Sequence, residues 1–275
     1  MRHQLFRCSP LTGFFLRISR VALFVVLFSV PLTSSYATPH VLRVCLMDTE
    51  LFPLWRKPGA EHEEQPGINI EMQQLIAQQL GHTIEWVRAP FPRCLVLLRQ
   101  NEVDVLNVAS YSPDREIYGR YPKDAGSIDI SKRLKSDCYN AYVLKEDEVS
   151  FDGQHFYNLK NKPIAIEIGA SIRNYLNDKN IPVYEVSRVS QAFGMLSRGR
   201  VSAVVTNQFN GLSYTSDSIV ELPIAVRNRA YFLVISHQFY ARYPNFADQL
   251  WEVSEYVREQ HHQQLMRQYT AGEPW

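Results

Sequence analysis

Short apolar runs and segments with helical spacing alternate along the chain after residue 40. In residues 68–80, for example, Ile68, Met72, Ile76 and Leu80 fall on one helical stripe, and Gly81 follows where helices often end. Apolar runs of strand length occupy residues 41–47, 83–87, 103–108, 163–168, 182–186 and 201–205. Further helices are predicted at residues 94–99 and 190–198. A third helix is predicted to follow residues 169–171 and to run through Leu176. This alternation predicts an α/β fold, with a mostly parallel sheet covered by helices.

The order helix, turn residue, strand occurs in residues 95–105 and again in residues 193–203. This echo predicts two similar lobes, each a mixed sheet flanked by helices. Apolar runs at 139–144 and 230–235 are predicted to cross between the lobes as a two-strand hinge, and residues 246–269 have the spacing of a final helix. The predicted boundaries are 1–37 for a leader, 38–140 and 230–275 for lobe 1, and 141–229 for lobe 2.

The first 37 residues have the layout of a secretory signal peptide. Their only charged side chains are four arginines, and an apolar run of 12 residues follows at 21–32. Ser35 and Ala37 are small residues at the −3 and −1 positions of a cleavage site. The run is short for a bilayer, which needs about 20 residues. The leader therefore predicts export, and a periplasmic location for the rest of the chain.

Removing the leader makes the chain mildly acidic. The full sequence has 29 basic and 28 acidic residues, and the leader holds four of the basic ones. The remainder has 25 basic and 28 acidic residues, a net charge of −3. No basic stripe remains, which excludes nucleic acid as the expected partner. No other segment has the pattern of a membrane span.

Three cysteines remain after the leader, namely Cys45, Cys94 and Cys138. An oxidising compartment permits one disulfide among them, and the sequence leaves the pair open. No catalytic cysteine signature is present. Adjacent His261 and His262 face different directions on a helix, and His62 lies in a charged loop, so no metal site is expected.

Ligands of open α/β sheets bind beyond the carboxyl ends of the strands. That rule selects residues 48–55, 109–115, 169–173 and 206–209. Two of these segments suit an anion. Ser112 and Pro113 can begin a helix that carries Arg115, whose planar guanidinium matches a carboxylate. Residues 169–171 offer backbone N–H groups and the Ser171 hydroxyl at a helix start. The alternative for Arg115 is a surface salt bridge with Asp114 or Glu116.

Several motifs in this order resemble the type 2 periplasmic solute-binding proteins of the polar amino-acid uptake class, the bacterial extracellular solute-binding protein family 3. They are Gly67-Ile68-Asn69-Ile70-Glu71-Met72, Ile76-Ala77-Gln78-Gln79-Leu80-Gly81, Val103-Asp104, Ser112-Pro113-Asp114-Arg115, Gly169-Ala170-Ser171, and Gly199-Arg200-Val201-Ser202-Ala203-Val204-Val205-Thr206. The resemblance covers nearly all of the chain after the leader. It implies a two-lobed α/β clamp that closes on a small ligand.

The resemblance also implies ligand-binding roles for particular residues. Arg115 falls at the carboxylate-binding arginine, Ala170 and Ser171 at a second carboxylate contact, and Ala109 and Ser110 at backbone and hydroxyl contacts. Phe52 and Trp55 lie in a loop that supplies an aromatic wall, unless they only pack within the lobe.

One position departs from the family pattern. Asn207 stands where amino-acid binders of this class place an aspartate for the ligand's ammonium, and a neutral amide makes a weaker contact. Standard α-amino-acid binding is therefore in question, and an organic acid, a modified amino acid or a short peptide-like acid fits as well. Asp48 is a candidate for the missing charge. Arg173 is a candidate second cation for a dicarboxylate, or an exposed helix charge.

The expected function is capture of a small anionic or zwitterionic metabolite by hinge closure, as a monomer, for delivery to an ABC permease. The alternatives are a ligand-binding partner of a membrane sensor and a periplasmic dehydratase of the same fold. Such dehydratases carry a glutamate just after the turn at 169–171, where this chain has Arg173, while Glu167 precedes the turn. An arginine is no general acid near neutral pH, so no catalytic residue and no cofactor are expected.

Overall fold

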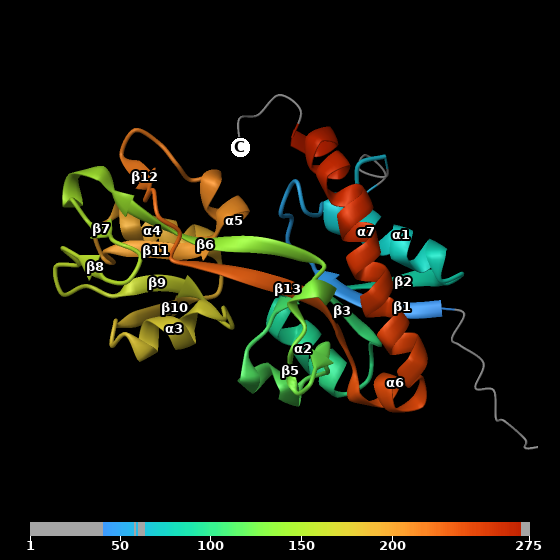
Figure 1. Cartoon of the computed structure of the whole chain (residues 1–275). Helices are drawn as coiled ribbons and strands as arrows, with labels where there is room; N and C mark the ends of the chain where they lie inside the picture. The colour runs from blue at the N-terminus through green and yellow to red at the C-terminus, as the bar shows by residue number, and fades with distance from the viewer. Residues whose placement is uncertain (1–40, 58, 60–63, 271–275) are drawn as a thin grey trace, which may run out of the picture. The chain divides into compact units, whose positions relative to one another are not determined.

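The computed structural model describes residues 41–57, 59 and 64–270, in which strands and helices alternate (Figure 1). The first elements are β1 (Val41–Met47), α1 (Ile68–Gln79), β2 (Thr83–Ala89), α2 (Phe91–Arg99), β3 (Val105–Ser110), the 3-10 helix η2 (Pro113–Ile117), β4 (Lys123–Asp124), β5 (Ser127–Ile128), η3 (Ile130–Lys132) and β6 (Lys135–Leu144). They are followed by η4 (Lys145–Asp147), β7 (Ser150–Phe151), β8 (Phe156–Tyr157), β9 (Ile164–Glu167), α3 (Ile172–Asp178), β10 (Val183–Val186), α4 (Val189–Ser197), β11 (Ala203–Asn207), α5 (Gln208–Leu212), β12 (Ile219–Glu221), β13 (Arg227–Ile235), α6 (His237–Arg242) and α7 (Pro244–Thr270).

Nine strands form one mixed sheet in the order β10-β9-β11-β6-β13-β3-β1-β2, with β12 beside β6. Strands β1, β2 and β3 pair in parallel at one end, which we call the β1 half. Strands β9, β10 and β11 pair in parallel at the other end, the β9 half. The mixed α/β fold predicted from the sequence is confirmed.

Strands β6 and β13 connect the two halves (Figure 1). They pair with each other from Tyr139↔Arg227 to Lys135↔Tyr231. Beyond that stretch, β13 pairs with β3 and β6 pairs with β11. Both strands begin earlier than their apolar runs suggested, because their polar first residues are paired within the sheet.

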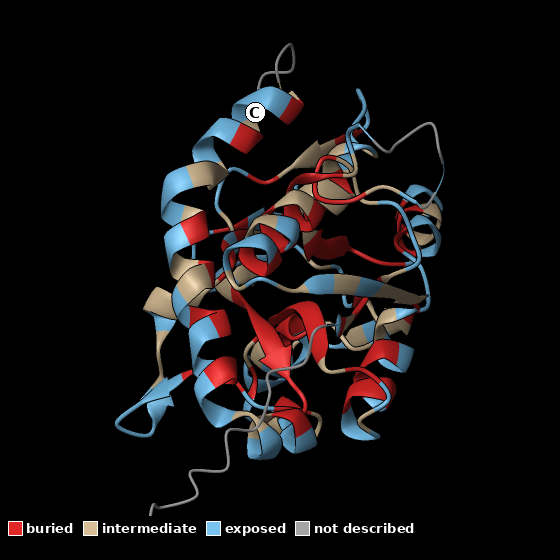
Figure 2. Ribbon diagram, turned by 90° about the vertical axis from the view of Figure 1, so that its right-hand side faces the viewer, coloured by how far each residue is buried: buried red, intermediate tan, exposed pale blue. Residues whose placement is uncertain are grey.

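Each half has its own hydrophobic core. In the β1 half, Val44 and Leu46 pack with α1 and α7, while Cys45 faces α2 on the other side of the sheet. Strand β1 is thus buried on both faces, which explains its continuous apolar run. Figure 2 shows buried residues along the strands and along one side of the long C-terminal helix. In the β9 half, separate clusters pack with α3 and with α4.

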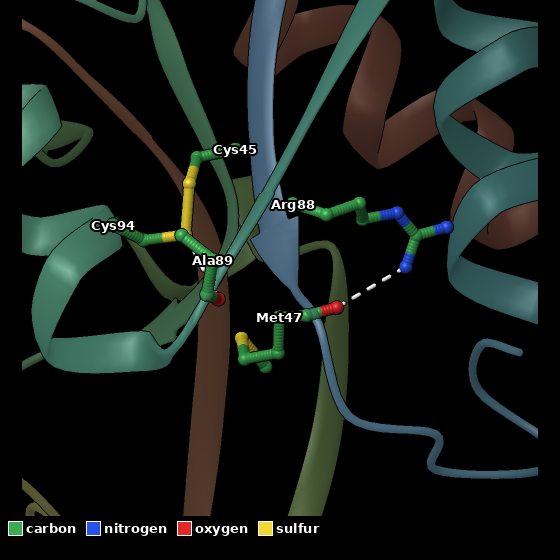
Figure 3. Close-up of a disulfide and its surroundings, with 5 residues drawn as sticks. All are labelled: Cys45, Met47, Arg88, Ala89 and Cys94. Carbon is green, nitrogen blue, oxygen red and sulfur yellow. Dashed lines mark hydrogen bonds between the residues drawn. A yellow bond between two sulfur atoms is a disulfide. The ribbon is translucent and has the colours of Figure 1, made fainter. Parts of the chain in front are cut away.

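A disulfide joins Cys45 in β1 to Cys94 in α2, and both residues are fully buried (Figure 3). It lies on the opposite side of the strands from Arg88, which donates to the carbonyl of Met47 (Figure 3). Among the described cysteines, the free thiol is that of Cys138, whose Sγ lies 3.1 Å from Asn228 Oδ1. The pair that the sequence left open is therefore Cys45–Cys94.

Helix α2 begins at Phe91, three residues before the start that the sequence predicted. Prolines at positions 90 and 92 flank that start, and proline suits the first helical turn, where a missing N–H costs nothing. Within the described ranges, no helix combines the length and the apolar character that crossing a membrane requires. The predicted leader lies outside the described residues.

Removing the disulfide should destabilise the fold strongly. The bridge closes a loop between residues 49 apart, and the chain-entropy relation gives about 4 kcal/mol for such a loop. We expect the Cys45→Ala/Cys94→Ala variant to lose roughly that much unfolding free energy in urea titrations. Cys138→Ala is the matched control and should stay within about 0.5 kcal/mol of the wild type. Equal losses in the two variants would contradict this account.

Candidate functional site

The guanidinium of Arg115 links the two halves of the sheet. Its Nη1 donates to the carbonyl oxygen of Ser110 at 2.6 Å and to Ser110 Oγ at 2.9 Å. Its Nη2 donates to the carbonyl oxygen of Gly169, in the β9 half, at 2.6 Å. Arg115 is only 5% exposed. It is therefore no surface salt-bridge residue, and Glu116 pairs with Lys123 instead.

Two hydroxyls meet beside this guanidinium. Ser110 Oγ and Ser171 Oγ are 2.7 Å apart and buried, one from each half. Gly169 has a φ of +82°, a conformation that favours glycine, and this turns its carbonyl toward Arg115. Phe91 completes the cluster, because the Arg115 guanidinium carbon lies 5.1 Å from its ring centroid. Phe91 could not be singled out from the sequence, since its role depends on the early start of α2.

The predicted helix at Ser112 is a short 3-10 helix, η2, rather than an α-helix. Ser112 occupies the N-cap position, but its hydroxyl bonds to the Asp114 carboxylate and caps no backbone N–H. Helix α3 has only seven residues, and the Ser171 side chain does not cap it. Arg115 is placed by the end of β3 and this single tight turn.

Asn207, at the end of β11, belongs to a buried polar network on the crossing strands. Its Nδ2 donates to Asp137 Oδ2 at 3.4 Å and to the Tyr231 hydroxyl. Asp137 forms an ion pair with Lys135, with Nζ to Oδ2 at 2.7 Å and side chains 2% and 4% exposed. Sequence reasoning missed this pair. Its i, i+2 spacing places both residues on one strand face, but the strand was expected to begin only at residue 139.

A second arginine reaches the same turn. Arg229 in β13 donates through Nη2 to the carbonyl oxygen of Ser171 at 3.4 Å. Its Nε is buried and has no hydrogen-bond partner among the described residues. Burial lowers the pKa of Arg229, and the positive charge of Arg227 acts in the same direction. The sequence did not single out Arg229, because only the register of β13 brings it to Ser171.

Of the other predicted site residues, Trp55 and Phe52 pack within the β1 half, Asp48 is exposed, and Ala109 and Ala170 adjoin the two serines. Trp55 is buried, and its indole N–H donates to the carbonyl of Thr49 at 2.7 Å. Phe52 packs near Tyr269, with ring centroids 6.1 Å apart. Asp48 is exposed just after β1, Ala109 is buried in β3, and Ala170 is half-buried in the turn. The structure thus brings together Arg115, Ser110 and Ser171. Asn207 bonds to the hydroxyl of Tyr231, which is paired with Ser110 in the sheet.

Two further charged residues lie near the turn. Arg173 is 54% exposed and pairs with Glu185, at 3.0 Å from Nε to Oε1. Glu167 is partly buried, and this burial raises the pKa of its carboxyl to about 7. Asn210 Nδ2 lies 3.5 Å from its Oε2. In residues 41–57, 59 and 64–270, no cluster of three or more His, Cys, Asp or Glu side chains is placed to hold a metal ion.

No protein-family model matches the sequence, and no curated protein sequence matches it significantly. Solved structures share its fold. An ancestral arginine-binding protein bound to glutamine gives a TM-score of 0.65 at 16% identity, covering 85% of this chain and 99% of that one. A histidine kinase sensor domain similar to periplasmic binding proteins gives 0.64 at 15% identity, covering 83% and 95%. The substrate-binding protein of an amino acid ABC transporter gives 0.62 at 19% identity, covering 84% and 99%.

At these identities the likeness establishes the fold, which is that of type 2 periplasmic amino-acid-binding proteins. The fold predicted from the motifs is therefore confirmed.

The raised pKa of Glu167 predicts a pH-dependent stability. The folded pKa is about 7 and the ordinary value is 4.5, so the folded state binds more protons between these values. Stability should therefore fall as the pH rises from about 4.5 to about 7 and then level off. Glu167→Gln removes this dependence. We expect the difference in unfolding free energy between wild type and variant to change by about 1–3 kcal/mol from pH 4.5 to pH 8, discounted for partial exposure. Parallel pH profiles of unfolding free energy for the wild type and Glu167→Gln, measured in urea titrations, would refute this prediction.

Proposed function

We propose that this protein is a periplasmic solute-binding protein, a two-lobed clamp that captures a small carboxylate-bearing metabolite by hinge closure. The observation that carries the proposal is the contact of the Arg115 guanidinium with both halves of the sheet. A buried guanidinium with hydroxyl groups beside it is a suitable carboxylate site. In this proposal Ser110 and Ser171 are the hydroxyl contacts, and the adjoining Ala109 and Ala170 supply backbone groups.

The lobes correspond to residues 38–140 with 230–275 and to residues 141–229, with the hinge in β6 and β13. Arg115 Nη2 donates to the Gly169 carbonyl, which is a neutral acceptor. A carboxylate accepts a stronger, charge-assisted bond. A ligand carboxylate would therefore replace this carbonyl, and contacts made only in the closed form would shift the lobes toward closure.

The proposed setting is the periplasm, reached through the leader at residues 1–37, with the clamp acting as a monomer. The proposed partner is an ABC permease, in line with the fold shared with an amino acid ABC transporter's substrate-binding protein. A second candidate is a ligand-binding partner of a membrane sensor, favoured by the likeness to a histidine kinase sensor domain. Genes beside this one distinguish them: a permease and an ATPase favour uptake, and a membrane kinase favours sensing.

Binding without catalysis fits the residues at the turn better than dehydration does. A dehydratase of this fold needs a general acid soon after the turn, where Arg173 is tied to Glu185. Glu167 precedes the turn and contacts Asn210 in α5. The site therefore suits a clamp whose work is capture and release.

Arg115→Ala should abolish ligand binding. The purified protein would be screened by thermal shift against amino acids, dicarboxylates, keto acids and small peptides. A ligand that binds only the folded state raises the melting temperature in a dose-dependent way. Arg115→Ala should remove that rise while the circular dichroism spectrum stays native. Arg115→Lys keeps the charge without the planar fork and should retain a reduced rise. Undiminished binding by Arg115→Ala would overturn the clamp assignment.

A further inference from the structure

The crossing strands place several charged side chains on one face of the sheet. Strand register sets Ser110 opposite Tyr231, Tyr231 opposite Lys135, and Arg229 opposite Asp137. Directly opposed residues of antiparallel strands project from the same face. The hydrogen bonds confirm this, because Ser110 and Arg229 both contact Ser171. We call this surface the junction face.

The charges on the junction face do not balance. Lys135 and Asp137 form a buried ion pair that is neutral as a unit. Arg115 donates to oxygen atoms of Ser110 and of Gly169, all of them neutral acceptors. Arg229 donates to the carbonyl of Ser171. Across the described part of the chain, neither arginine has a carboxylate within salt-bridge distance, so two positive charges stand uncompensated.

Arg229 also has unused hydrogen-bonding capacity. Its Nε is shielded from solvent and has no partner. A buried donor without an acceptor costs free energy, and a charged donor costs more. The positive charge of Arg115 adds to the unfavourable environment of Arg229. An anionic group between the two guanidiniums would relieve both penalties.

Among the described residues, the junction face itself offers no unpaired carboxylate for a ligand ammonium. Asn207 is neutral, and Asp137 already accepts from Lys135, from Asn207 and from the backbone N–H of Cys138. An ammonium placed here would face two guanidiniums without a counter-charge, and like charges at close range repel.

We infer that the ligand is a dicarboxylate without an ammonium group, with one carboxylate on Arg115 and the second on Arg229. The inference rests on the proposed clamp function and names its ligand class. It makes Arg229 the specificity-determining residue for the second carboxylate. The exposed Arg173, held by Glu185, has no part in it.

Isothermal titration calorimetry tests the ligand class. The purified protein is unfolded in guanidinium chloride and refolded to strip any bound ligand. It is then titrated with the dicarboxylates from malonate to adipate, with the monocarboxylates from propionate to hexanoate, and with aspartate and glutamate. We expect one dicarboxylate to bind more tightly than its monocarboxylate and its amino-acid counterparts. Tighter binding of glutamate than glutarate, or of aspartate than succinate, would overturn the inference.

Matched variants test the role of Arg229 in binding the second carboxylate. Arg229→Gln should weaken the best dicarboxylate roughly tenfold to hundredfold, the effect of one lost charged hydrogen-bonding group. It should leave the matched monocarboxylate within about twofold, since that ligand needs only Arg115. Arg173→Gln, the control from the neighbouring helix, should change neither. Arg229→Lys keeps the charge and should restore part of the loss, and circular dichroism checks the fold of each variant.

The outcomes separate the two proposals. If Arg115→Lys weakens binding and Arg229→Gln leaves the ratio of dicarboxylate to monocarboxylate affinity unchanged, the dicarboxylate inference fails and the clamp stands. If the refolded wild type binds none of these acids, the dicarboxylate inference fails, and the clamp fails as well if the thermal-shift panel shows no ligand.

Discussion

The buried guanidinium of Arg115 is the constraint on which the contact between the two halves depends. A charge withdrawn from water must be compensated by hydrogen bonds. Arg115 meets this requirement with acceptors on β3 and with the carbonyl of Gly169, and this contact joins the halves beside the Ser110–Ser171 hydrogen bond. Phe91 stacks on the same guanidinium, and its helix is fixed to β1 by the Cys45–Cys94 bridge. The polar junction is thus supported by a rigid core behind it.

The character of this junction differs from that of the cores on either side. The cores are apolar and interlocked, whereas the halves meet at Arg115 through hydroxyls, carbonyls and a guanidinium. Such groups can exchange their partners for water or ligand at small net cost, because a hydrogen bond contributes only about 1 kcal/mol net. Two continuous strands meanwhile keep the halves in register. Strong cores, linking strands and an exchangeable polar contact are the physical requirements of a clamp.

Hydrophobic spacing predicted the longer strands and the helices α1 to α4 and α7, because these elements are buried against the core of their half. It did not predict short elements such as β4, β7 and β12. It also placed Arg115, Ser110 and Ser171 near one another, through the rule that strand ends gather at one edge of a sheet. It could not predict Lys135, Asp137 or Arg229. These are polar residues at the starts of β6 and β13, where apolar spacing gives no signal, and their meeting depends on long-range register. The disulfide was likewise beyond the sequence, because choosing among three cysteines requires their positions.

In the structure, Asn207 has a different role from the one that the sequence predicts. From the sequence it was interpreted as the loss of an aspartate that would pair with a ligand ammonium. In the structure its amide donates to Asp137 and to the Tyr231 hydroxyl. An aspartate at this position would put a second carboxylate against Asp137, and like charges at that range raise a pKa or force the groups apart. The asparagine is therefore the residue that Asp137 requires. The negative charge beside Asn207 is that of Asp137 on β6, which Lys135 neutralises, and the unbalanced charge on the junction face belongs to the two arginines.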